Sequence, residues 1–156
     1  MAPHAAPSRE QPTASTDLQA GKDLKLGDFE HVDAALSLSE ARIVLNRVTE
    51  VRNGMNIPLN ENDTMTKTRD YLEIFSVFKR KTDAEESDRV LASFEANLHF
   101  FEKAQMKNLA PTCADEAKAL IPSLEKQVED GVVDEGTLDN ICNELQKVKM
   151  RAELEE

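Results

Sequence analysis

The sequence predicts a small all-α protein, a helical bundle with an extended N-terminal arm. Three observations support this fold class. Apolar residues recur at helical spacing in one stretch after another, several of these stretches begin with a residue pattern typical of a helix cap, and no alternating segment is long enough for a confident strand. With 156 residues, 40% of them hydrophobic, the chain has enough apolar material for the core of one domain.

The charge balance limits the class of partner. The formal net charge is −11, from 30 acidic against 19 basic residues. Nucleic-acid binding depends on Lys and Arg that displace counterions, so a self-sufficient DNA or RNA binder is not expected. A basic protein partner would suit this charge, although solubility alone explains it equally well.

The cysteines and the hydropathy indicate where such a chain would function. Cys113 and Cys142 are separated by 29 positions and form no CxxC pair, so we expect two free thiols in a reducing compartment. No run of 18 apolar residues is present, so no membrane association is expected. The first residues lack a secretory apolar core, and a single Arg9 is poor support for an organelle transit peptide.

The chain divides by composition into four parts. Residues 1–22 carry three of the six prolines among Ala, Ser and Thr, and we expect a disordered tail. The other predicted parts are a partner-binding arm with the first helix at 23–52, a linker at 53–64 and a helical bundle at 65–152.

The arm has apolar residues with no obvious internal partner. Leu24 and Leu26 alternate before Gly27, and Phe29 and Val32 follow. Two interpretations remain open, an extended arm that adds to a neighbouring sheet and a loop that lies over the domain's own core.

The first helix is predicted from Ser37 to Gly54. Ser37 and Glu40 have the spacing of a capping box, and Asn53-Gly54 ends the helix. One face is apolar and is expected to meet the core; it consists of Leu38, Ala41, Val44, Leu45, Val48 and Val51. Ile43 falls outside this face. Two interpretations remain open, a lone exposed side chain and a residue that makes an intermolecular contact.

Two further helices follow the linker. The second is predicted over 65–81, with Lys79-Arg80-Lys81 at its negative C-terminal end. Its shared apolar face is Tyr71, Leu72, Phe75 and Phe78. The third is expected to open with Asp83 and Glu86 as a capping pair, and its apolar residues are Val90, Leu91, Phe94 and Leu98.

The C-terminal third predicts three more helical segments. A short helix covers 99–109, and His99 at its start is interpreted as a structural histidine. Ala110-Pro111 breaks the chain, and Thr112 with Asp115 suggests a cap for a helix from about Cys113. The buried residues expected there are Ala114, Ala117, Leu120 and Ile121, with Leu124 beyond a break at Pro122. The last helix has a core stripe of Leu138, Ile141, Cys142, Leu145 and Val148.

No catalytic, cofactor-binding or metal-binding residue is predicted. Cys113 lies at a helix start, where a thiol can be activated, but no base with an orienting group accompanies it, so it is interpreted as a packing residue. The stretch around Gly131 and Gly136 fails the spacing of a calcium loop in both registers. No P-loop, GxGxxG, GxSxG or HExxH occurs.

Three stretches resemble a known family. "FFEKAQMKNLAPTCADEAKALIPSLE" is similar to the C-terminal signature of the fourth subunit of eukaryotic, and in our expectation fungal, RNA polymerase II, a subunit with a counterpart in archaeal RNA polymerase. "LSLSEARIVL" resembles the family's first helix and "TRDYLEIFSVFKR" the helix after its variable linker. The resemblance extends from about Leu26 to Val148. The linker is short here and lacks the long charged insertion of some members.

The resemblance implies a non-catalytic subunit in the nucleus, with shuttling to the cytoplasm as a further expectation. It implies a bundle similar to the HRDC domain of helicases, a stalk heterodimer with the seventh subunit, binding to the polymerase core, and RNA contact mainly through the partner. The stalk would serve initiation and transcript handling. Combined with the apolar pattern, it predicts five partner-binding residues, namely Leu24, Leu26, Phe29, Leu38 and Ile43. Two alternatives are a stand-alone HRDC-like nucleic-acid-binding module, which needs a basic face, and an acidic helical adaptor.

Overall fold

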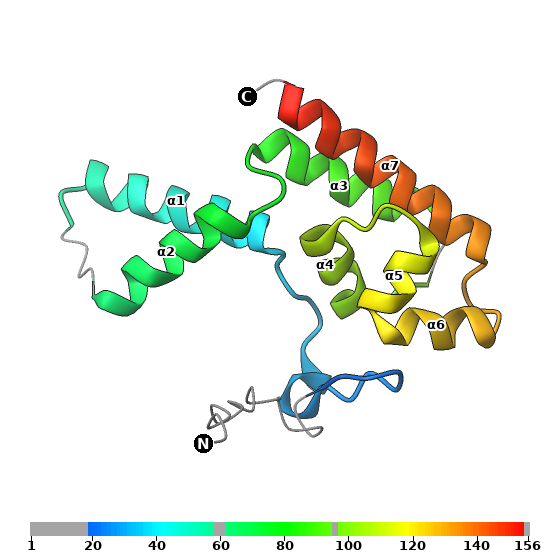
Figure 1. The fold of residues 1–156 in the computed structure, drawn as a ribbon. Helices are drawn as coiled ribbons and strands as arrows, with labels where there is room; N and C mark the ends of the chain where they lie inside the picture. The colour runs from blue at the N-terminus through cyan, green and yellow to red at the C-terminus, as the bar shows by residue number, and fades with distance from the viewer. Residues whose placement is uncertain (1–18, 58–61, 95–96, 155–156) are drawn as a thin grey trace, which may run out of the picture.

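The computed structural model describes residues 19–57, 62–94 and 97–154, and within them it contains helices and no strand. In chain order these are the 3-10 helix η2 (Gly27–His31), α1 (Leu38–Gly54), α2 (Asp63–Phe75), α3 (Lys81–Ser93), α4 (Phe100–Leu109), α5 (Ala114–Leu120), α6 (Pro122–Glu129) and α7 (Glu135–Leu154). Figure 1 shows α1 and α2 as a hairpin on one side of a body formed by α3 to α7. The all-α prediction is therefore confirmed for the described part of the chain.

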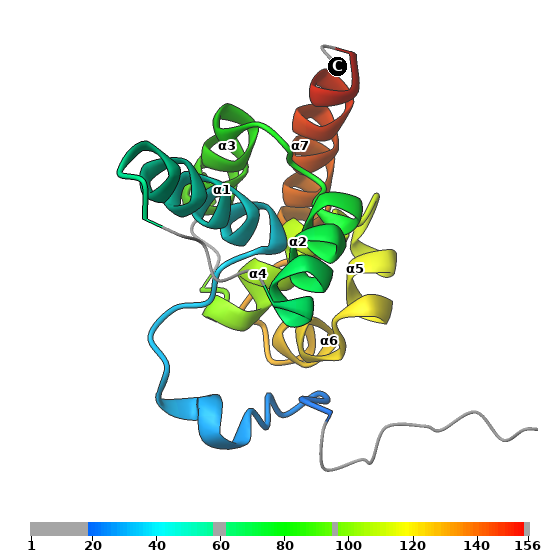
Figure 2. The same cartoon turned by 90° about the vertical axis from the view of Figure 1, so that its left-hand side faces the viewer.

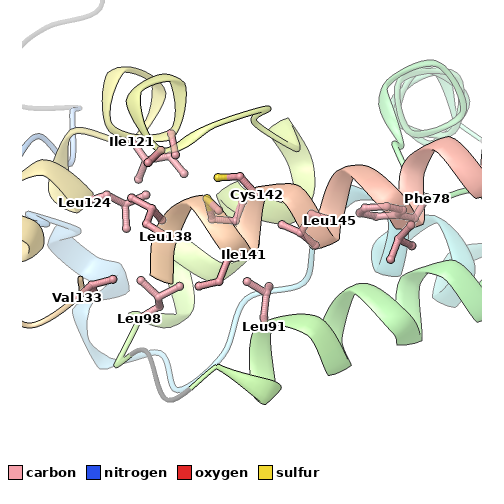
Figure 3. Close-up of a cluster of buried hydrophobic side chains, with 14 of the residues drawn as sticks. Phe78, Leu91, Leu98, Ile121, Leu124, Val133, Leu138, Ile141, Cys142 and Leu145 are labelled. Atoms are coloured by element: carbon pink, nitrogen blue, oxygen red, sulfur yellow. The ribbon is translucent and has the colours of Figure 1, made fainter. Parts of the chain in front are cut away.

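The core lies along α7. Its predicted stripe is fully confirmed, since Leu138, Ile141, Cys142, Leu145 and Val148 are all buried. Figure 3 shows Leu138, Ile141, Cys142 and Leu145 of α7 with Leu91 and Leu98 on one side and Ile121 and Leu124 on the other. Burying an aliphatic side chain contributes about 1.5–3 kcal/mol, so this one helix organises most of the body's stability.

The segment around Pro122 folds largely as predicted. The helix α5 ends at Leu120, and Pro122 occupies the first turn of α6, where its missing N–H costs nothing. Ala114, Ala117, Ile121 and Leu124 are buried, whereas the prediction for Leu120 is wrong, because this side chain is exposed. The cap at Thr112 also differs, since its N–H and hydroxyl both donate to Glu116 rather than pairing with Asp115.

The second helix is shorter than predicted. It ends at Phe75, and Arg80 and Lys81 begin α3 instead of closing α2. Phe78 is fully buried, but from the connection between the helices, where its N–H donates to the Ser39 hydroxyl at 3.0 Å. This distant contact holds the connection extended. Tyr71 and Phe75, predicted to share its face, are exposed.

The start of α3 and the loop after it also correct the prediction. Asp83 does not cap the helix; it is buried and bound to the Arg80 guanidinium at 2.8 Å. Leu91 is buried and Val90 and Phe94 pack against the core as expected. Leu98 is buried too, but it lies after the end of the helix.

The first helix has the predicted cap and an unpredicted orientation. The Ser37 hydroxyl accepts from the Glu40 N–H, and the Glu40 carboxylate accepts from the Ser37 N–H at 2.6 Å. The predicted core face is correct only in part: Leu38, Ala41 and Leu45 are half-buried, whereas Val44, Val48 and Val51 are exposed. Ile43, predicted outside that face, packs against the core cluster. The periodicity identifies the apolar residues of the helix, but it does not indicate which of them the chain's own core covers.

The predicted disordered tail lies mostly outside the described residues, as does part of the linker at 58–61. From residue 19 the chain forms the arm (residues 19–37), which runs below the helices to α1 in Figure 2.

Candidate partner interface

The hairpin is held together along one face of each helix. The Arg42 guanidinium binds the Glu73 carboxylate with two nitrogens, at 2.5 and 2.9 Å, and its third nitrogen donates to the Lys79 carbonyl at 2.7 Å. Farther out, the Arg69 guanidinium donates to the Thr49 hydroxyl at 3.2 Å. Bidentate arginine–carboxylate pairs fix geometry as well as adding energy, so these contacts define which face of α1 is turned toward α2.

A second set of contacts fixes α1 on the body. The buried Lys107 ammonium on α4 binds Glu40 at 2.9 Å and Asp88 on α3 at 2.7 Å. The Leu38 N–H donates to the Asn108 side chain at 2.8 Å. The first turn of α1 is thereby tied to α3 and α4, and the direction of the whole helix follows from it.

These attachments leave an apolar stripe of α1 in solvent. We define the α1 outer stripe as Val44, Val48, Val51 and Met55, which are all exposed. At 100° per residue these side chains lie within about 60° of one another, roughly opposite Arg42 and Thr49. Because α2 occupies that opposite face, the hairpin itself cannot cover the stripe.

The other helix of the hairpin carries its own exposed apolar group. Tyr71 and Phe75 stack with ring centroids 4.6 Å apart, and Ile74 beside them is 71% exposed. Leu72, one position away from Tyr71, is buried. A helix with one side buried and an aromatic cluster on the other is typical of a chain that has further protein contacts.

The arm is attached near its start and carries exposed apolar side chains. Lys22 pairs with Glu125 and Asp23 with Lys126, each at 2.6 Å, which ties the arm to α6. Hydrogen bonding to Lys126 lowers the pKa of Asp23, and hydrogen bonding to Glu125 raises the pKa of Lys22. Beyond these contacts Phe29 on η2 is 68% exposed.

The structure places the five predicted partner-binding residues at different points. Leu24 is half-buried in a left-handed conformation, with φ of +51°. Leu26 and Phe29 line one apolar hollow of about 400 Å³ next to the first turn of α4. Leu38 is half-buried in the first turn of α1, and Ile43 lines a separate hollow between α1 and α3. The predicted outward orientation of Ile43 is wrong because α1 is rotated by its contacts with α4.

Sequence reasoning missed several exposed or hollow-lining residues. Val44, Val48 and Val51 of the α1 outer stripe were assigned to the core, and Met55 was placed in the linker. Leu36 was not singled out, although it is exposed and lines the hollow beside Ile43. Phe100 and Phe101 line the arm hollow and were given no role from the sequence. A sign of them in the sequence is the pair itself. Two adjacent residues in a helix point about 100° apart, so one buried face cannot hold both aromatic side chains.

The two thiols lie in different settings, and neither is accompanied by a metal-binding cluster among the described residues. Cys113 is the cap residue of α5 and is half-buried; Cys142 is buried, and desolvation raises the pKa of its thiol to about 12. A thiol of that pKa is protonated at neutral pH and is a poor nucleophile. Across the described residues no three potential metal ligands cluster. His99 caps α4, with its Nδ1 accepting from the Phe101 N–H.

No helix in the described ranges has the length and apolar character needed to cross a bilayer.

Comparison with known proteins finds relatives that share one name. The DNA-directed RNA polymerase II subunit rpb4 of Schizosaccharomyces pombe is 38% identical over 121 residues, which cover 72% of this chain and 84% of that protein. The subunit of the same name in Dictyostelium discoideum is 41% identical over 80 residues, 51% of this chain and 49% of that protein. The Saccharomyces cerevisiae subunit RPB4 is 39% identical over 88 residues, 56% of this chain and 37% of that protein. The family model described as RNA polymerase Rpb4 matches residues 35–149, from the end of the arm through most of α7, and the chain belongs to this family.

Proposed function

We propose that this protein is a non-catalytic subunit of nuclear RNA polymerase II that joins the enzyme as a heterodimer with the seventh subunit. The interface is the arm together with the α1 outer stripe. The observation that carries this proposal is the exposure of a whole apolar helix face in a chain of the Rpb4 family. A contiguous exposed apolar surface rimmed by polar residues is typical of a protein–protein interface.

The predicted contact residues take different roles in this interface. Leu26 and Phe29 contact the partner directly from the arm, and Leu24 shapes the arm's turn. Leu38 and Ile43 are half-buried and act indirectly. Ile43 packs against the core cluster and the Leu38 N–H donates to Asn108, and both contacts fix the position of α1. The direct contacts on α1 are therefore Val44 and its neighbours in the stripe.

The net charge of −11 supports a protein-binding rather than an RNA-binding role. An acidic surface repels phosphate, so RNA contact in the complex falls mainly to the partner subunit. In the polymerase the heterodimer serves initiation and transcript handling, with shuttling to the cytoplasm a further part of the proposal. A stand-alone HRDC-like nucleic-acid-binding module is the alternative, and it would need a basic face that this composition does not favour.

Co-expression with the seventh subunit and sizing of the purified complex test the proposal. We expect a 1:1 heterodimer with the wild-type chain and none with Val44→Asp/Val48→Asp, because a charge desolvated at an interface costs several kcal/mol. Val132→Asp is the matched control, since Val132 is as exposed as Val44 but lies between α6 and α7. A double variant that assembles normally would show that α1 is not the interface.

A further inference from the structure

The hollow beneath the arm is nearly all apolar and lies next to the proposed interface. Leu26, Phe29 and Val32 form its arm side, two alanines continue that wall, and Phe100 and Phe101 of α4 form the other side. Its volume is about 400 Å³. An apolar cavity of about 150 Å³ is enough to hold one benzene ring, so this hollow has room for a large aromatic side chain and part of a neighbouring one.

The α4 side of the hollow is held rigidly. The buried Glu102 carboxylate accepts from the His99 N–H at 2.8 Å, from the Ser123 hydroxyl at 2.6 Å and from the Gln127 amide at 2.6 Å. These bonds join the first turn of α4 to α6, and that turn carries Phe100 and Phe101. Because this wall is already fixed, binding does not have to order it, and no conformational entropy is lost there when a partner binds.

The arm side is fixed at both ends. Its start is joined to α6 by the ion pairs of Lys22 and Asp23, and its end enters the Ser37–Glu40 cap that Lys107 holds. Between these points η2 contains no buried residue. The arm therefore spans the hollow as a strap, and its apolar side chains line a space that the other described residues do not fill.

The residues that adjoin the arm wall, which we take as the rim of the hollow, are mainly acidic. Asp28, Glu30 and Asp33 alternate with the apolar wall residues of the arm, and all three are exposed. The basic and titratable side chains beside the walls are Lys25 and His31 on the arm and Lys103 on α4, so the three carboxylates still outnumber the two lysines. Such a rim attracts a partner segment that carries Lys or Arg.

We propose that this hollow is the socket for an aromatic anchor of the seventh subunit, on a segment with basic residues on either side of the anchor. The inference rests on the proposed function, since it names the chemistry of the partner at that same interface. An aromatic group meets Phe29, Phe100 and Phe101 in edge or offset contacts, and a buried aromatic in a fitted pocket is the usual source of the largest binding contributions. The basic flanks contact Asp28 and Asp33.

The test fills the hollow without removing any group from it. Ala35 lines the hollow, and the chain has no Trp of its own, so Ala35→Trp occupies the space and also supplies a fluorescence signal for its burial. Ala119→Trp is the matched control, because Ala119 is exposed on α5. Affinity for the purified seventh subunit is measured by titration, after circular dichroism and the Tm of each variant have been compared with wild type.

We expect Ala35→Trp to weaken binding by about 30-fold or more and Ala119→Trp to leave it unchanged. Unchanged affinity in Ala35→Trp, with Val44→Asp/Val48→Asp still unable to assemble, would overturn the socket and leave the heterodimer standing. Normal assembly of both variants would overturn the heterodimer interface as well.

Two further variants keep the proposal testable if Ala35→Trp does not fold. Phe29→Ala removes an exposed wall residue, and we expect about a tenfold loss of affinity; no loss would overturn the socket. Asp28→Lys/Asp33→Lys tests the basic flanks. We expect its association rate to fall several-fold at low salt and to match wild type at high salt, and an equal rate at low salt would overturn that part of the proposal.

Discussion

Replacing Lys107 with methionine tests how the hairpin is fixed on the body. The side chain of Lys107 is 7% exposed, and its ammonium binds Glu40 of α1 and Asp88 of α3. Methionine keeps the length and most of the apolar stem while it removes the charge. The two carboxylates are then left without their shared cation, and Glu40, which also closes the α1 capping box, is the more buried of the two.

The expected loss of stability is about 2 kcal/mol. Breaking a fully buried ion pair costs about 3–5 kcal/mol, but half of the Asp88 side chain is in solvent, and water screens an exposed pair to within about 1 kcal/mol. A loss of this size corresponds to a fall in Tm of about 4–8 °C for a chain of this length.

Thermal and urea unfolding followed by circular dichroism measure this loss. Lys147→Met is the control, because Lys147 pairs with Glu144 at 2.5 Å on the surface and should cost less than about 0.5 kcal/mol. Adding Glu40→Gln to Lys107→Met should recover part of the loss, since it removes the unpaired charge. Equal effects of the two lysine variants would show that the buried site contributes no more than a surface pair.

The same site gives a prediction of pH dependence. Partial burial by itself would raise the pKa of Glu40, but the hydrogen bonds from Lys107 and Ser37 outweigh it and hold the pKa below the ordinary value of 4.5. A carboxyl with a lowered folded-state pKa contributes its stability above the unfolded-state value and loses it as the pH falls through the folded value. The stability difference between wild type and Lys107→Met should therefore be full above about pH 5 and shrink below pH 4.5.

Three other predictions concern the body and the tail. Cys142→Asp should destabilise the protein by several kcal/mol because it places a charge in the core, whereas Cys113→Ala should cost less and leave assembly intact; a thiol reagent at pH 8 should modify Cys113 well before Cys142. Glu102→Gln should cost about 2 kcal/mol in urea unfolding, since one amide oxygen cannot accept all three of its hydrogen bonds. Removing residues 1–18, which retains Lys22, should leave the Tm within about 2 °C, because their composition offers little to bury.

The elements that could be predicted from sequence are those whose determinants are local. The capping box at Ser37 depends on residues three positions apart, and a proline such as Pro122 cannot lie in the interior of a helix because it lacks a backbone donor. The stripe of α7 was predictable because that helix is buried on the same face that its period marks. None of these three predictions requires knowledge of which residues of other helices lie opposite.

The connection between α2 and α3 could not be predicted, because a distant contact determines it. Phe78 has the spacing of a fourth residue on the α2 face, and the sequence alone favours a longer helix there. The helix ends because the Phe78 N–H binds Ser39, 39 positions earlier in the chain. The hydrogen bond and the burial of the Phe78 ring stabilise the extended connection more than one further turn would stabilise α2. Helix propensity alone contributes little for the residues of such a turn.

The arm hollow was only half predictable for a related reason. Leu26 and Phe29 were identified as apolar residues without an internal partner, and both line the hollow. Phe100 and Phe101 lie 71 or more positions farther along the chain, and only the fold brings them beneath the arm. A surface formed by two distant segments leaves no periodic pattern in either one.

Ile43 and Val44 show why an interface helix misleads a prediction based on one chain. They are neighbours in sequence, and on a helix they point about 100° apart, so one of them meets the core and the other meets solvent. The periodicity assigned the larger apolar face to the core, as the hydrophobic effect acting within one chain would require. In a subunit of a complex the hydrophobic effect acts across the whole assembly. The larger apolar face of a helix is then buried where the contact area is larger, whether that contact is with the chain's own core or with another subunit. The chain's own body holds α1 through Ile43, the Leu38–Asn108 and Phe78–Ser39 hydrogen bonds and the Lys107 network. The larger face is left exposed in this chain, which is the arrangement expected of a helix that completes its burial in the proposed complex.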